Sequence, residues 1–506
     1  MNSLQRIIVN TIAQYVRTVV NILLSLYTVR VILDTLGVVD YGIYSLIAGV
    51  TAMLAFMTNA LVTTTQRYMS FYQGKKDINK MKEVFSNSEF LHLVLGVFLV
   101  IILSLLTPLL FGGFLNVPEE RLVASQYLYI IIVVILFVTF CTAPFRALLI
   151  SHENILYISI VDIADGVLKL ALVLLLPVIQ YDHLIVYGIL LLIVQLFNLV
   201  ALGIYAFIKY EECIFPRLAL LNKHYFKELS SFSGWVIYGT GCAMTRTQGI
   251  AIVVNRYLST VANASYGLGL QISGAVSTVS TALLNAMRPQ IVKEEGAGNH
   301  QMAMERSFVL CKFSFYLMAL ICIPCVVEMP RLLELWLKEV PDYAVLFARM
   351  SLIAGLADSL TLGLSVTNEA IGNVKQYNLV IASLKLLALP LSWLLIFLTG
   401  NPIYIAFSFV GMEFITSFVR LPFLKKTGGL VIHEFLRDIT LKEILPLLSI
   451  TVVSILVTVL LENPYRFVIN YIISSIVFFF VILFSGLTVK ERQLAKNVVT
   501  SFFKKQ

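Results

Sequence analysis

Two arginines lie in apolar segments long enough to cross a membrane, and the first of them, Arg17, belongs to the run Val9–Leu33. Polar side chains recur in this run at steps of three and four residues, which places them on one face of a helix. They are Asn10, Gln14, Arg17, Asn21, Ser25 and Thr28. Because an arginine facing lipid costs about 3 kcal/mol, we expect this stripe to face a bundle interior or a water-filled cavity.

A polar stripe also occurs where two membrane helices pack and their amides and hydroxyls bond across the interface. Both interpretations stay open, and we favour the cavity because the sequence shows no evident acidic partner for Arg17. In a cavity, a guanidinium group binds phosphate through two parallel hydrogen bonds. Arg30, near the other end of the same run, is long enough to reach the membrane surface.

The second arginine, Arg246, lies in the apolar segment 231–255 beside a polar face. That face carries Tyr238, Gly241, Thr245 and Gln248. Two cationic walls suit an anionic cargo, and neutral amides suit the hydroxyl groups of a sugar. The candidate substrate-binding residues are therefore Arg17, Arg246, Asn21, Gln14, Gln248, Asn59 and Arg30.

Charged residues in other apolar segments are candidates for gating or for ion coupling. Asp165 and Lys169 are four residues apart, so they can pair on one face of a helix. Such a pair either holds the bundle together or takes part in gating or proton handling, and the sequence does not separate these roles. The further candidates are Asp162, Lys385 and Asp358. Lys312 lies near the end of its segment and is expected to snorkel to the surface.

Composition and missing motifs argue against an enzyme. Of the 506 residues, 59% are hydrophobic and only 13% are charged, which is typical of an integral membrane protein. No phosphate-binding glycine loop, zinc motif or serine nucleophile motif is found. We expect no metal site and no cofactor, apart from a coupling Na⁺ or H⁺. Five of the six cysteines lie in apolar runs, so no disulfide framework is expected.

The apolar runs predict an all-α protein with fourteen transmembrane helices. Lysine and arginine gather in the breaks after even-numbered helices and at both ends of the chain, which predicts that both termini are cytoplasmic. The predicted helices are 8–33, 41–63, 89–111, 122–144, 155–177, 184–208, 231–255, 261–287, 305–328, 342–366, 377–399, 402–422, 443–462 and 467–488.

An internal repeat divides these helices into two sets. A shift of 225 residues lays Val29–Gly42 over Val254–Gly267. At an offset of 216 residues, Leu168–Leu170 matches Leu384–Leu386. The repeat unit has six helices, an even number, so both halves insert in the same direction. We therefore predict an N-terminal lobe at 1–210, a C-terminal lobe at 211–425, and two additional helices with a cytoplasmic tail at 426–506.

Three sequence motifs resemble those of the Wzx-type polysaccharide flippases, which belong to the multidrug/oligosaccharidyl-lipid/polysaccharide (MOP) exporter superfamily. They are Asp40-Tyr-Gly-Ile-Tyr-Ser-Leu-Ile47, Thr65-Gln-Arg-Tyr-Met69 and Leu335-Trp-Leu-Lys-Glu-Val-Pro-Asp-Tyr343. The resemblance implies two lobes around a V-shaped cavity and alternating access across the bacterial cytoplasmic membrane. It also implies export of an undecaprenyl-pyrophosphate-linked oligosaccharide for O-antigen or capsule assembly, with Arg17 and Arg246 receiving the pyrophosphate. A polysaccharide polymerase and a chain-length regulator are the protein partners that it implies.

Two other functions are alternatives to this expectation. A cation-coupled multidrug antiporter of the same superfamily would use Asp162, Asp165, Asp358 or Glu413 for its ion, although the first helix carries no acidic residue before Asp34. This alternative stays open. A glycosyltransferase or polymerase would need a sizeable outer loop with catalytic groups, and the outer breaks predicted here are too short for one.

Overall fold

The computed structural model describes residues 3–52, 55–114, 117–215, 221–337, 340–463, 465–488 and 491–492. Helices account for nearly all of the described residues, and none of these residues lies in a β-strand. The chain is therefore an all-α protein, as the apolar runs predict. It divides into two compact units, which we treat separately: unit 1 comprises Met1–Thr240 and Arg288–Asn299, and unit 2 comprises Gly241–Met287 and His300–Gln506.

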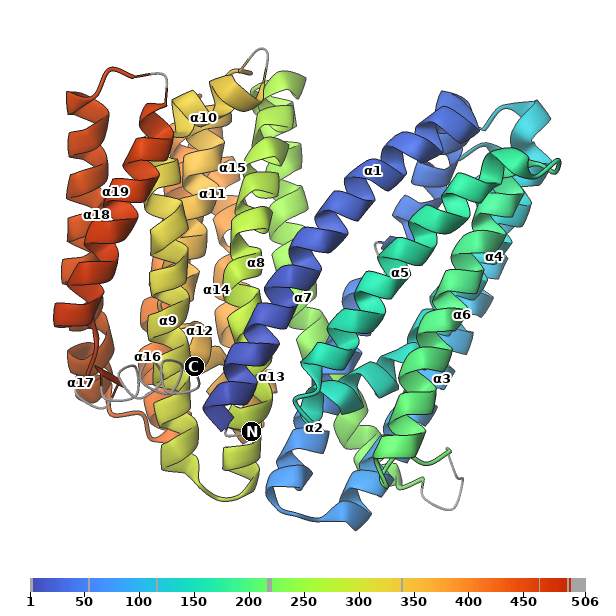
Figure 1. The fold of residues 1–506 in the computed structure, drawn as a ribbon, viewed down its shortest axis with the longest axis horizontal. Helices are drawn as coiled ribbons and strands as arrows, with labels where there is room; N and C mark the ends of the chain where they lie inside the picture. Colours follow the sequence, from blue (N-terminus) through green and yellow to red (C-terminus); the bar gives the residue numbers. More distant parts are fainter. Residues whose placement is uncertain are drawn as a thin grey trace, which may run out of the picture. The chain divides into compact units, whose positions relative to one another are not determined.

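Unit 1 is built from six helices together with parts of two more. They are α1 (Ser3–Ala52), α2 (Ala55–Gly74), α3 (Ile78–Leu109), α4 (Leu122–Ser151), α5 (Ile155–Leu175), α6 (His183–Lys209), the first part of α7 (Lys223–Tyr257) and the last part of α8 (Thr260–Gly296). Helix α1 packs along α5, and α4 packs against α6, α3 and α2 (Figure 1). These contacts therefore join all six helices α1 to α6 inside the unit.

Unit 2 contains the rest of α7 and α8 and the helices that follow them. They are α9 (His300–Val327), α10 (Met329–Trp336), α11 (Ala344–Ser359), α12 (Leu362–Ile371), α13 (Val374–Tyr377), α14 (Ser383–Leu386), α15 (Ala388–Thr399), α16 (Ile403–Gly428), α17 (Ile432–Phe435), α18 (Leu441–Leu460) and α19 (Arg466–Val481). Short π-helical turns continue several of them, including η6 (Leu436–Thr440) and η7 (Ile482–Gly486). Helices α18 and α19 lie side by side and also contact α9 (Figure 1).

Nine helices among the described residues are long and apolar enough to cross a membrane, and the bent pair α11 and α12 raises this number to ten. The protein is thus a multi-pass membrane protein, while fourteen spans remain a prediction. Helix α5 is not among the nine because Asp162, Asp165 and Lys169 interrupt its apolar run. Helix α1 joins the first two predicted spans through a kink at Gly37, whose φ of 76° suits glycine.

Helix α4 is longer than the sequence predicts. We expected it to end at residue 144, but it continues through Pro144 to Ser151. The missing amide of a proline removes one hydrogen bond, and neighbouring helices can compensate for that loss in a membrane protein. The extra two turns place Arg146 inside the helix and not in a connecting segment.

Candidate substrate-binding site

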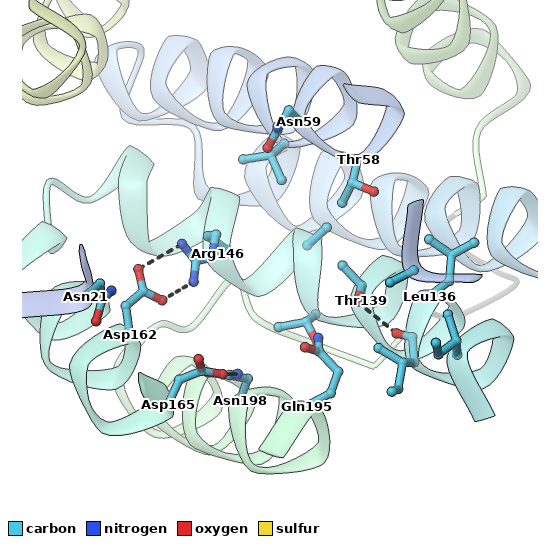
Figure 2. Close-up of a pocket in the computed structure, with 16 residues that line it drawn as sticks. Asn21, Thr58, Asn59, Leu136, Thr139, Arg146, Asp162, Asp165, Gln195 and Asn198 are labelled. Atoms are coloured by element: carbon cyan, nitrogen blue, oxygen red, sulfur yellow. Dashed lines mark hydrogen bonds and ion pairs between the residues drawn. The ribbon is translucent and has the colours of Figure 1, made fainter. Parts of the chain in front are cut away.

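A polar pocket of about 510 Å³ lies within unit 1. Helices α1, α2, α4, α5 and α6 all contribute to its walls (Figure 2). Its polar lining residues are Asn21, Thr58, Asn59, Thr139, Thr142, Arg146, Asp162, Asp165, Gln195 and Asn198. Amides and hydroxyls of this kind both donate and accept hydrogen bonds, as sugar hydroxyls require.

Asp162 is the carboxylate at which two arginines of this pocket region meet. Arg17 Nη1 donates to Asp162 Oδ2 over 2.8 Å, and Arg146 Nη1 donates to the same oxygen over 3.2 Å. Arg146 Nη2 also donates to Asp162 Oδ1, so Arg146 holds the carboxylate with two nitrogens (Figure 2). Arg17 therefore has an acidic partner, which the sequence did not reveal, and Arg146 is the arginine that lines the pocket.

A second ion pair lies three residues further along α5. Lys169 Nζ is 2.8 Å from Asp165 Oδ2, which confirms the pairing expected from their spacing. Asn198 Nδ2 from α6 also donates to Asp165, over 2.5 Å (Figure 2). Counted together, the cluster of unit 1 formed by Arg17, Arg146, Lys169, Asp162 and Asp165 has three cations and two carboxylates. We call it the N-cluster.

The polar stripe of α1 serves both packing and the pocket. Asn10 donates to the carbonyl oxygen of Glu153 over 2.8 Å, and Gln14 is buried. Asn21 lines the pocket, and it can lie against α5 because Gly166 leaves room: a Cβ at Gly166 would be 3.1 Å from Asn21 Oδ1. Part of the stripe thus matches the packing interpretation. The side chain of Arg30, the remaining α1 candidate, lies outside the described residues.

Unit 2 contains a buried charged cluster that includes Arg246. Arg246 Nη1 donates to Glu413 Oε1 over 2.5 Å, and its guanidinium carbon lies 4.4 Å from the centre of the Phe409 ring. Lys385 Nζ bridges Glu413 Oε2 at 2.8 Å and Asp358 Oδ1 at 2.7 Å. Gln248, predicted to act with Arg246, is exposed on unit 2.

Arg420 completes this cluster, and the sequence analysis did not select it. Its Nη2 is 2.8 Å from Asp358 Oδ1, and its Nη1 donates to Thr361 Oγ1 over 3.0 Å. We call the set Arg246, Lys385, Arg420, Asp358 and Glu413 the C-cluster. It has the same balance as the N-cluster, three cations to two carboxylates. Lys169 and Lys385, which the repeat aligns, each belong to one of the two clusters.

The charge balance of both clusters favours an anionic ligand. An ionised group buried without compensation is costly, so a site with one cation in excess is stabilised when an anion binds. Guanidinium groups provide the planar pairs of donors that phosphate accepts. Among the described residues, no group of three histidine, cysteine or acidic side chains is arranged to hold a metal ion.

The burial of Lys312 differs from the prediction made from its position near a helix end. We expected its ammonium to reach the membrane surface, but the residue is fully buried. Its Nζ lies 3.0 and 2.9 Å from the two carboxylate oxygens of Glu491, which follows α19 in the chain. The partner comes from a distant segment, so sequence spacing could not identify it.

The sequence profile of the polysaccharide biosynthesis protein family matches residues 3–293, more than half of the chain. The chain belongs to this family. A search of the curated proteins finds no significant match to this chain. The match confirms the resemblance found in the sequence and covers the whole N-cluster.

Solved structures similar to this family member are transporters of the MATE and MOP groups. A MATE crystal structure in the bent conformation has a TM-score of 0.74 at 13% identity, covering 85% of this chain and 98% of that one. The MATE transporter ClbM in complex with Rb⁺ has a TM-score of 0.71 at 15% identity, with coverages of 84% and 95%.

A MOP superfamily transporter from Pyrococcus furiosus, whose binding pocket is described as having reverse polarity, has a TM-score of 0.69 at 12% identity and coverages of 86% and 97%. At these identities the likeness shows the fold. This member of the polysaccharide biosynthesis family therefore has the fold of these MATE and MOP transporters.

Proposed function

We propose that the protein is a flippase that moves an undecaprenyl-pyrophosphate-linked oligosaccharide across the bacterial cytoplasmic membrane. Membership in a polysaccharide biosynthesis family on a transporter fold supports this class of cargo. The observation that carries the proposal is the N-cluster: two arginines share Asp162 beside a pocket lined with amides and hydroxyls. Such a site offers excess positive charge to a pyrophosphate and neutral hydrogen-bonding groups to the adjoining sugars.

In this proposal, Arg146 and Arg17 form the first phosphate-binding site, and Arg246 belongs to a second site in unit 2. An incoming phosphate competes with Asp162 for the guanidinium groups. Both arginines therefore stay paired with an anion throughout binding. Asn21, Asn59, Gln195 and Asn198 provide contacts for the sugars.

The test is complementation in cells that lack the gene. Arg146→Ala, Arg17→Ala and Arg246→Ala are expressed, and lipid-linked oligosaccharide left on the cytoplasmic leaflet is measured together with surface polysaccharide. Arg437→Ala is the matched control, because Arg437 is an exposed arginine paired with the neighbouring Asp438 over 2.9 Å. The proposal expects accumulation with Arg146→Ala, Arg17→Ala and Arg246→Ala and normal export with Arg437→Ala. Normal export by all three cluster variants would contradict it.

A further inference from the structure

A second group of charged residues lies in unit 2, outside the C-cluster. Unlike the C-cluster, it has more carboxylates than cations. It contains Lys312 of α9, Glu443 in the first turn of α18, and Glu491 after η7. Lys312 and Glu443 are 0% and 2% exposed. Water thus hardly reaches Lys312 and Glu443, whereas the side chain of Glu491 is 14% exposed.

The three groups are not paired equally. Both oxygens of Glu491 lie within 3.0 Å of Lys312 Nζ. Glu491 Oε2 also accepts from the amide of Thr488 over 2.7 Å, and the amide of Glu491 donates to Thr488 Oγ1 over 3.3 Å. This reciprocal pattern is a capping box, which stabilises an ionised carboxylate at the start of a helix. Glu491 is therefore the carboxylate that pairs with Lys312.

Glu443 accepts no hydrogen bond at either carboxylate oxygen from the described residues. The ammonium of Lys312, on the adjoining helix α9, is already held by Glu491. A buried, unpartnered carboxylate is strongly unfavourable when ionised, so the group takes up a proton instead.

Other titratable groups nearby do not supply the missing positive charge. Lys442 is the next residue on α18, but neighbouring helical residues point in different directions, and its Nζ lies 3.5 Å from the carbonyl oxygen of Leu487. From α9, Tyr316 donates to the carbonyl oxygens of Lys442 and Gly486, and Cys311 is buried without charge.

The remaining charges around this group are engaged elsewhere. Arg437 and Asp438 of η6 pair with each other, Arg492 donates to the carbonyl of Phe484, and Arg420 belongs to the C-cluster. A metal ion is disfavoured, because two carboxylates provide too few ligands and the lysine repels a cation.

We propose that Glu443 is a proton-binding site of unit 2, and that its proton is linked to the ion pair between Lys312 and Glu491. While Glu443 holds the proton, Lys312 is free to bind Glu491. When the proton leaves to solvent water, Glu443 becomes an anion that competes with Glu491 for the same ammonium. This site is separate from the proposed phosphate-binding residues and does not depend on the nature of the cargo.

Infrared difference spectroscopy of the purified full-length protein tests the proposal directly, since a buried protonated carboxyl group has its own C=O stretching band. Wild type at neutral pH is expected to show this band, and Glu443→Gln is expected to lose the part of it that does not come from Glu89, whose buried Oε2 also has no partner among the described residues. Glu434→Gln is the matched control, because Glu434 is an exposed residue nearby on α17, and it should leave the band unchanged. A spectrum that Glu443→Gln does not change would overturn the proposal.

A second variant tests the charge balance without altering Glu443. In Glu491→Gln, one ammonium faces one carboxylate, so Lys312 should pair with Glu443 and the Glu443 part of the carboxyl band should disappear at neutral pH. Persistence of that part in this variant would contradict the proposal. Loss of the same part from the wild-type band on adding Na⁺ or K⁺ at constant pH would also overturn it, in favour of a metal-ion site. Glu443→Gln and Glu491→Gln each replace a carboxylate with an amide of similar size, so the fold should be retained.

Discussion

Arg146 and Asp162 face each other with two nitrogens on two oxygens, and Arg17 approaches the same carboxylate from α1. The side chains of Arg17, Arg146 and Asp162 are 23%, 33% and 16% exposed, so the three charges are only partly hydrated. Asp162 is therefore the group that balances two guanidinium groups while no anionic ligand is bound.

Asp162→Asn should convert this arrangement into an unbalanced one. The amide cannot neutralise either arginine, and removing one partner of a buried ion pair typically costs about 3–5 kcal/mol, a figure reduced here by partial exposure. We expect a lower melting temperature, and a larger stabilisation by added inorganic pyrophosphate than wild type shows, because the ligand binds the folded state. Thermal unfolding with and without pyrophosphate measures both effects. A variant as stable as wild type and indifferent to pyrophosphate would contradict the assignment.

The C-cluster predicts opposite consequences for two variants of one ion pair. Arg246→Ala leaves two cations with two carboxylates, so the protein should fold and keep most of its stability while export is lost. Glu413→Gln leaves three cations with one carboxylate and should lower the free energy of unfolding by about 2–4 kcal/mol. Thermal unfolding and export assays are run on both variants. If Arg246→Ala were the more destabilised of the two, the charge balance would not govern the cluster.

Arg121 joins two carboxylates near the start of α4. It donates to Asp40 from Nε over 2.8 Å and to Asp182 from Nη1 over 2.6 Å. Burial alone would raise the pKa of Asp182, but hydrogen bonds from Arg121 and from the amides of Ile185 and Leu184 hold that pKa below its ordinary value of 3.8. A lowered carboxyl pKa stabilises the folded state above the ordinary value, and this stabilisation is lost as the pH falls through the folded value.

Wild type should therefore lose melting temperature more steeply below about pH 4 than Arg121→Met does. At neutral pH the variant should be about 1–2 kcal/mol less stable, because all three side chains are partly exposed. Melting curves from neutral to acidic pH measure both expectations. Parallel pH profiles for wild type and Arg121→Met would argue against the role given to Asp182.

Two glycines allow α2 and the end of α8 to cross in backbone contact within unit 1. A Cβ at Gly74 would lie 2.0 Å from the carbonyl oxygen of Lys293, and one at Gly296 would lie 2.0 Å from that of Phe71. Because backbone must move, Gly296→Ala should destabilise by about 1–3 kcal/mol. Gly234→Ala is the control, since nothing lies within 4 Å of its Cβ position. Equal melting temperatures for the two variants would contradict this account.

Local spacing predicted some of these contacts and missed others for a physical reason. The pair Asp165 and Lys169 followed from the sequence, because helix geometry alone brings residues four apart together. The partner of Arg17 did not, because Asp162 is 145 residues away and meets it only when α1 packs on α5. The buried pairing of Lys312 with Glu491 was missed for the same reason.

Pro144 explains why the sequence analysis missed Arg146, a side chain that lines the pocket. The run of apolar residues ends near Pro144, so the sequence analysis placed Arg146 in a connecting segment, whereas α4 continues to Ser151. A usable signal was present: Thr139, Thr142 and Arg146 follow at steps of three and four, and all three line the pocket. The all-α class, the family and the membrane-spanning character were predicted correctly, because they depend on periodicity and composition.

The three charges of α5 also bear on how the chain enters the membrane during synthesis. A helix carrying Asp162, Asp165 and Lys169 is a poor substrate for insertion on its own. Both arginines that hold Asp162 are translated before it, on α1 and α4, so a counter-charge is already in place when α5 leaves the ribosome. Arg246 has no such advantage, since Glu413 is made 167 residues later. Arg246 must therefore remain without Glu413 while most of the second half of the protein is synthesised.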